Sequence, residues 1–142
     1  MLKTIIQASE NFCIHQIRLP HKIKKSVSKK RTLIAYIDIN THDKRKHRVY
    51  IASEHGLVQR VSQLFLEEDE SDEETLIDML LETTNLIVGS AKVIAEEENE
   101  NPYTISTPHF EKIDVFNFAY DDARTIKVKN DEMIIAIKEL DV

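Results

Sequence analysis

Hydrophobic residues recur every three or four positions in three stretches of the chain, which is the spacing of an amphipathic helix. The first stretch covers Met1 to Ile17 and places Cys13 on its apolar side. A shorter stretch covers Leu57 to Phe65. The third begins after Ser71 and runs to about Asn99, and Pro102 prevents it from continuing much further. The pattern thus predicts two long helices and one short helix.

Apolar and polar residues alternate elsewhere in the chain, which is typical of strands with one buried face. Thr32 to Ile39 and Arg48 to Ser53 should form a hairpin, with the polar segment Asn40 to His47 as a rather long loop. Later strands, separated by polar turns such as Asp121-Asp122 and Asn130-Asp131, are expected at Tyr103–Thr107, Ile113–Tyr120, Thr125–Lys129 and Met133–Lys138. These elements predict an α+β fold in a single domain over residues 1–142, an antiparallel sheet with two long helices and one short helix packed against it.

The long helix has a marked start and two distinct sides. Ser71 and Glu74 stand three residues apart ahead of an apolar run, so they are expected to form a capping box. At 100° per residue the core face comprises Ile77, Leu80, Thr84, Ile87, Val88, Ala91 and Ala95. The opposite side carries a straight polar stripe at steps of four and three residues, which consists of Asp78, Glu82, Asn85, Gly89, Lys92 and Glu96.

Glu82 and Asn85 are neighbours on this stripe, and Gly89 lies one turn beyond Asn85. A glycine inside a helix costs roughly 0.8–1 kcal/mol relative to alanine, so its presence calls for an explanation. A flat spot where a partner protein approaches closely would provide one. From spacing alone the alternative stays open that Glu82 and Asn85 are ordinary solvated residues and that Gly89 only tolerates a crossing strand.

Composition removes several classes of function. The 142-residue chain has two glycines, Gly56 and Gly89, which cannot build a phosphate-binding loop, a dinucleotide fingerprint or a nucleophile elbow. Cys13 is the only cysteine, which excludes an internal disulfide and a zinc site made of cysteine pairs. No pair with the helical spacing of metal ligands occurs among His15, His21, His42, His47, His55 and His109. We therefore expect no metal ion and no cofactor in this chain.

Charge is segregated along the chain, although the net charge is only −6. The segment Arg18 to Arg31 carries seven basic residues and no acid, whereas Glu67 to Glu74 is acidic except for Ser71. The basic segment is expected to be a solvated edge strand and the acidic one a loop leading into a helix; alternatively, the two form a field that steers a charged partner. Few aromatic residues accompany the basic segment, which argues against nucleic-acid binding.

Nothing in the sequence points to a membrane or to export. No apolar run is long enough to cross a bilayer, and the mean hydropathy is −0.35. Residues 1–6 lack the basic start and the long apolar stretch of a secretory signal. We therefore expect a cytoplasmic protein without a membrane partner.

The predicted long helix contains a run that resembles a family signature. Residues 81–92 read Leu-Glu-Thr-Thr-Asn-Leu-Ile-Val-Gly-Ser-Ala-Lys, which is similar to the Glu-x-x-Asn and Ile-x-Gly-x-Ala-Lys segments of the CheX family of chemotaxis phosphatases, relatives of CheC and FliY. The order of elements also resembles that family's, including the strand end Ile105-Ser106-Thr107-Pro108. The chain departs from the pattern at Leu86, where the family often has methionine, and at residues 109–112, where a glycine would follow. A single copy of the motif resembles CheX rather than the two-site CheC.

The resemblance implies an activity on another protein. The substrate would be the phosphorylated response regulator CheY, and the Mg²⁺ ion of its site would come with that substrate. Glu82, paired with a lysine of the regulator, and Asn85, which would orient the attacking water, are the expected catalytic residues. Asp78, Gly89 and Lys92 are the expected partner-binding residues. A homodimer through edge strands is also implied.

The same features allow a function without turnover. A non-catalytic module could use this helix to bind a phosphorylated response regulator, or it could be part of the flagellar switch. Sequence does not separate these functions from a phosphatase, whereas a turnover assay would.

Overall fold

The computed structural model describes residues 1–100 and 102–140, and an antiparallel sheet of seven strands forms its centre. The strands run in the order β1-β6-β7-β3-β2-β4, and β5 also pairs with β2, beyond the end of β4. Their bounds are His21–Lys24 (β1), Arg31–Thr41 (β2), Lys46–Ser53 (β3), Tyr103–Ile105 (β4), His109–Val115 (β5), Asp122–Val128 (β6) and Asp131–Leu140 (β7).

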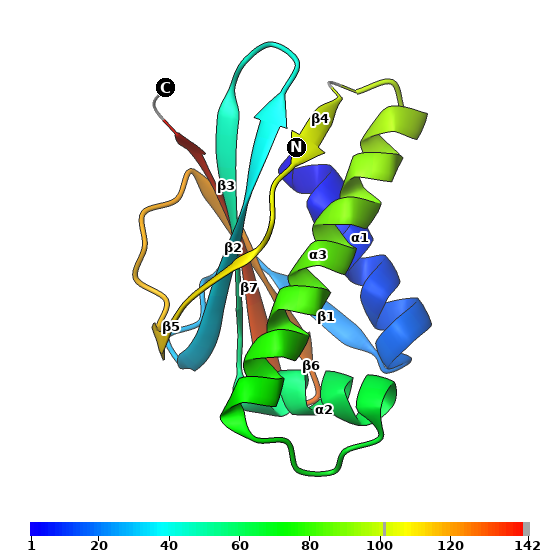
Figure 1. Cartoon of the computed structure of the whole chain (residues 1–142), viewed down its shortest axis with the longest axis vertical. Coiled ribbons are helices and arrows are strands. Elements are labelled where there is room, and N and C mark those ends of the chain that lie inside the picture. The colour runs from blue at the N-terminus through cyan, green and yellow to red at the C-terminus, as the bar shows by residue number, and fades with distance from the viewer. Residues whose placement is uncertain (101, 141–142) are drawn as a thin grey trace.

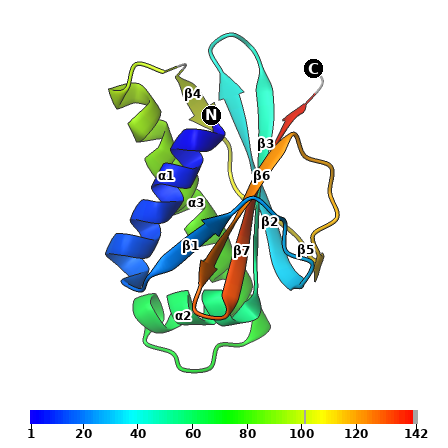
Figure 2. The same cartoon turned by 180° about the vertical axis from the view of Figure 1, so that it is seen from behind.

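Three helices cover one face of this sheet, which confirms the predicted α+β fold (Figures 1 and 2). The first, α1 (Leu2–Phe12), continues as a π-helical segment, η1 (Cys13–Ile17). It lies beside the longest helix, α3 (Glu73–Glu97), while α2 (His55–Leu66) crosses the end of the layer. No helix in the described part of the chain is both long and apolar enough to span a membrane.

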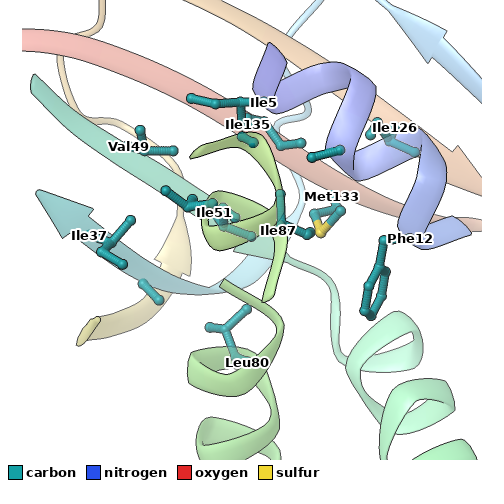
Figure 3. Packing of buried hydrophobic residues seen from close by; sticks show 14 of the residues in the cluster. Ile5, Phe12, Ile37, Val49, Ile51, Leu80, Ile87, Ile126, Met133 and Ile135 are labelled. Atoms are coloured by element: carbon teal, nitrogen blue, oxygen red, sulfur yellow. The ribbon is translucent and has the colours of Figure 1, made fainter. Parts of the chain in front are cut away.

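The main core lies between the sheet and these helices. Side chains from β2, β3 and β7 meet those of α1 and α3 there, and Figure 3 shows Ile51, Ile87 and Ile135 among them. Cys13 is fully buried in this core, as predicted, and burial raises the pKa of its thiol to about 11. The helices are therefore held by a continuous apolar layer, and this layer fixes which side of α3 faces outward.

The start of α3 differs from the predicted capping box. Asp72, not Ser71, caps the helix, because its carboxylate accepts a hydrogen bond from the Thr75 backbone N–H at 2.8 Å. Ser71 is held elsewhere: its hydroxyl donates to Glu68 at 2.8 Å and lies against the hydroxyl of Ser62 on α2. Competition from α2 thus moves the helix start one residue along the chain.

Two further predictions need correction. The strand expected at Ile113–Tyr120 is β5 at His109–Val115, because the next residues leave the sheet and cover its second face. There the ring of Phe118 stacks on that of Tyr50 at 5.0 Å between centroids, so the alternating aromatic residues of this segment pack over the sheet. The β2–β3 loop is also shorter than expected and comprises residues 42–45 only. Other strand and helix ends shift by a few residues.

The two charged segments take the structural roles expected of them. Part of the basic segment forms β1, which is an edge strand of the sheet. The acidic segment forms the loop between α2 and α3 and the first turn of α3. These placements leave the second interpretation, a field that steers a partner, untested.

Candidate functional site

The polar stripe of α3 faces outward, as the sequence predicts. Asp78, Glu82 and Asn85 are exposed, while Gly89 and Lys92 are half-buried further along the same helix. All five lie within the unbroken helix Glu73–Glu97. The segment that carries the expected catalytic pair is therefore neither a loop nor buried beneath the sheet.

Packing of the opposite side explains why these side chains point outward. Eight residues of α3 are buried against the sheet and the other helices: Leu76, Leu80, Thr83, Thr84, Ile87, Val88, Ala91 and Ala95. This set confirms the predicted core face except at Ile77, which is half-buried, and it adds Leu76 and Thr83, which were not predicted. Since the apolar side is fixed, the orientation of the polar side follows from the 3.6-residue period.

The first part of the stripe lines an open groove of about 510 Å³. One wall is α3, with Asp78, Glu82 and Asn85. The end of β4 and the segment that leads from it to β5 form the other wall, and Figure 1 shows this segment running alongside α3. Its lining residues are Ile105, Ser106, Thr107 and Pro108. Gly89 and Lys92 do not line this groove, so the structure separates the five predicted residues into two groups.

Ser106 fixes the second wall of the groove to the sheet. Its hydroxyl accepts a hydrogen bond from the Asp38 backbone N–H at 3.1 Å, and its own backbone N–H donates to the Asp38 carbonyl at 2.9 Å. The carboxylate of Asp38 accepts two bonds from Arg48, at 2.8 and 3.1 Å, which keep the pKa of that carboxyl below its usual value. Hydrogen bonds to the backbone of β2 thus hold the wall opposite α3, and the Asp38–Arg48 ion pair ties that part of β2 to β3.

Gly89 has open space around it. A Cβ atom built at this position would find no heavy atom within 4 Å, leaving aside the backbone of its own helix and its chain neighbours. The interpretation that this glycine makes room for a crossing strand is therefore wrong. Nothing in the described part of the fold requires a glycine here, which leaves the approach of another molecule as an explanation.

The groove can offer an amide and two carboxylates to a ligand. In the described residues, the side chains of Glu82 and Asn85 take part in no hydrogen bond or ion pair, so both are available to a partner. The carboxylates of the groove come from Asp78 and Glu82, and its lining residues include no lysine, arginine or histidine. Within residues 1–100 and 102–140, no three His, Cys, Asp or Glu side chains are placed to hold a metal ion. Such a surface suits a partner that presents a cation.

Sequence reasoning did not assign Thr107 and Pro108 to the site. A signal was present, because the Ser-Thr-Pro run stands at the end of a predicted strand. Its contribution as a wall beside α3 depends on β4 and β5 both pairing with β2, which places the run opposite Glu82. No local pattern encodes that pairing.

Comparison with known proteins identifies a family. The family model described as Chemotaxis phosphatase CheX matches residues 35–128, a range that extends from β2 to β6 and includes α3. No protein of curated function matches the sequence.

Solved structures share the fold over nearly the whole chain. CheX from Vibrio vulnificus is similar with a TM-score of 0.78 and 18% identity, covering 96% of this chain and 97% of that one. A chain of the CheX–CheY–BeF3–Mg²⁺ complex from Borrelia burgdorferi has a TM-score of 0.67 and 16% identity, with 97% of both chains covered. FliY from Thermotoga maritima has a TM-score of 0.57 and 12% identity, with 96% and 84% covered.

Proposed function

This chain belongs to the CheX family of chemotaxis phosphatases, and on that premise we propose that it dephosphorylates a phosphorylated response regulator of the CheY type. The observation that carries this proposal is the pair Glu82 and Asn85, which are exposed one helical turn apart and unpaired within the described chain. The Borrelia burgdorferi complex, which contains CheX and CheY together, supports a regulator as the partner. The α3 stripe would enter the phosphorylated site of that regulator.

Asn85 would position the water that attacks phosphorus. Hydrolysis of an aspartyl phosphate by in-line attack breaks the bond between phosphorus and the carboxylate oxygen, so the water must lie opposite that oxygen. A carboxamide has no pKa in the working range and cannot act as a general base. Its oxygen can accept a hydrogen bond from the water and direct a lone pair of that water toward phosphorus. The Mg²⁺ ion would be part of the substrate protein.

Glu82 would set the register of docking. By family resemblance it would pair with the lysine that contacts the phosphoryl group in the regulator. A charge-assisted hydrogen bond of this kind contributes on the order of 1.5–3 kcal/mol once water is excluded, whereas an exposed pair contributes little. Asp78 lies one turn before Glu82 in the same groove and would add negative charge toward the same cation.

The test is a phosphate-release assay with an excess of phosphorylated regulator. Positioning groups that act in the transition state supply roughly 10²–10³ in rate, so Asn85→Ala should lose activity by about this factor while its thermal unfolding stays unchanged. Glu82→Ala should mainly raise KM. Ser90→Ala is the matched control, because Ser90 is exposed on the same helix but lies off the stripe. An Asn85→Ala protein as active as the parent would contradict the proposed mechanism.

A binding module without turnover, which would dock on the regulator through the same exposed helix, is the second candidate. Catalytic amounts of a phosphatase should clear excess phosphorylated regulator, whereas a binder would protect one equivalent of it. The homodimer implied by the resemblance stays a prediction, which light scattering in solution would test. Such a dimer would pair through β1 or through the β4–β5 side of the sheet, which have no further strand partner among the described residues.

A further inference from the structure

Figure 2 shows strands β1 and β6 from behind, at one end of the sheet. A concave site separate from the α3 groove lies there. It has a volume of about 330 Å³ and is lined by Pro20, His21, Lys22, Lys127 and Lys129. We call it the basic pocket. None of its lining residues belongs to the α3 groove, so it is independent of the function proposed above.

Strand register brings like charges together in this pocket. Lys22 on β1 and Lys127 on β6 are direct partners in the ladder, so their side chains leave the same face of the sheet. Lys129 follows two residues later, in the turn between β6 and β7. Like charges directly opposite each other destabilise a strand pair, so this arrangement calls for an anion nearby.

Within the described residues, the carboxylates of Glu132 and Glu10 are paired with side chains other than the three pocket lysines. Glu132 is the ladder partner of Lys127 on its other side, but its carboxylate binds Lys24 at 2.7 Å and Lys30 at 3.4 Å. His21 lies 3.0 Å from Glu10, which is therefore also engaged. In residues 1–100 and 102–140, none of the three pocket lysines forms an ion pair.

Protection of a sheet edge explains only one of these three lysines. Lysine on an edge strand prevents pairing with other chains, and this accounts for Lys22. It does not account for Lys127, because β6 is paired on both sides, by β1 and β7. Nor does it account for Lys129, whose φ of 55° lies in the left-handed region that favours glycine. A lysine is thus present where glycine would be less strained.

We propose that the basic pocket binds a small anion carrying two or more phosphate groups. Three ammonium groups around a cavity match the charge of a diphosphate, and lysine binds phosphate as a point charge. The volume is at the lower end of the range for small-molecule sites. No phenylalanine, tyrosine or tryptophan is among its lining residues, and the imidazole of His21, the one aromatic ring there, is paired with Glu10, so the pocket offers a nucleotide base little surface for stacking. Recognition would therefore rest on the phosphate groups.

Titration calorimetry with pyrophosphate on the intact protein tests this proposal. Saturable binding of one equivalent is expected, with an affinity that falls as salt is added. Lys129→Gly should weaken it roughly five- to tenfold, as expected for the loss of one largely exposed charge contact, without harming the fold. Lys44→Gly is the matched control, because Lys44 is also exposed, also has a left-handed φ, of 67°, and lies in the β2–β3 loop. The affinity of the Lys44→Gly variant for pyrophosphate should equal that of the parent.

Three results would overturn the proposal. One is the absence of saturable pyrophosphate binding at low salt. Another is an equal loss in Lys129→Gly and Lys44→Gly, which would indicate a general effect of net charge. The third is binding of anionic vesicles or oligonucleotides by the same lysines when pyrophosphate does not bind. Asn85→Ala should bind pyrophosphate like the parent. Failure of the anion-binding proposal is therefore distinguishable from failure of the phosphatase proposal.

Discussion

Gly89 offers a test in which stability and activity should change in opposite directions. Replacing it by alanine removes the glycine penalty of roughly 0.8–1 kcal/mol in a helix interior. Since a Cβ at this position meets no heavy atom within 4 Å, no clash offsets that gain. Gly89→Ala should therefore raise the free energy of unfolding by nearly the full amount, and raise Tm by about 3 °C for a chain of this size.

Gly89→Leu should separate folding from docking. Leucine is nearly as good a helix former as alanine, so the protein should again be at least as stable as the parent. Side chains on a helix lean toward its N-terminus, so leucine at this position would extend over the turn that carries Asn85. A displacement of about 1 Å at a reacting centre can reduce a rate by roughly 10²-fold, and we expect a loss in kcat/KM approaching that size.

Circular dichroism melts and the phosphate-release assay would measure both effects. Gln63→Leu provides the control, because Gln63 is an exposed helical residue on α2, away from the groove. It should leave kcat/KM unchanged. If Gly89→Leu retains full activity, the proposed close approach of a partner at this position is wrong. If Gly89→Ala lowers Tm, the reasoning from open space around the glycine fails instead.

Two predictions concern groups buried away from the groove. Ion pairs with Lys24 and Lys30 lower the pKa of Glu132 below its usual 4.5. These ion pairs therefore stabilise the fold fully above pH 4.5, and the stabilisation is lost as the pH falls through the lowered pKa. Urea unfolding should give a lower free energy of unfolding at pH 3.5 than at pH 7, and this difference should be smaller in Glu132→Gln. An equal pH dependence in the parent and the variant would refute the stabilising role of Glu132. Burial raises the pKa of the Cys13 thiol from 9.0 to about 11, so at pH 8 it should react with Ellman's reagent at least roughly hundredfold more slowly than in urea. Equal rates would contradict this.

Much of the fold could be predicted because periodicity reports burial directly. The long helix, its core face and its exposed stripe all follow from a 3.6-residue period, and the structure differs by only a residue or two at the ends of α3. The predictions that were wrong concern features decided by competition between segments of the chain. Ser71 was a suitable cap by spacing, but contacts with α2 hold it outside the helix. The alternating aromatics after Val115 had the pattern of a strand, yet they pack over the sheet instead of pairing within it.

The grouping of the groove residues was predictable only where a single element carries them. Asp78, Glu82 and Asn85 could be grouped from the sequence because one helix carries them all. The wall formed by Ser106, Thr107 and Pro108 and the basic pocket both depend on strand register. The sequence placed Lys22 within a basic edge strand, but could not show that Lys127 lies opposite it. Register is set by long-range pairing, which short-range patterns do not report.

The polar run at residues 82–85 shows how one turn of α3 serves both the core and the groove. Glu82 and Asn85 are exposed, while Thr83 and Thr84 between them are buried. Each threonine hydroxyl donates to the carbonyl four residues earlier, to Met79 at 2.7 Å and to Leu80 at 2.8 Å, so burial leaves no polar group unsatisfied. Since the inner half of the turn is packed, the backbone that carries Glu82 and Asn85 is already ordered. Docking of a partner here would therefore restrict mainly the rotamers of these two side chains, and the backbone would need no rearrangement.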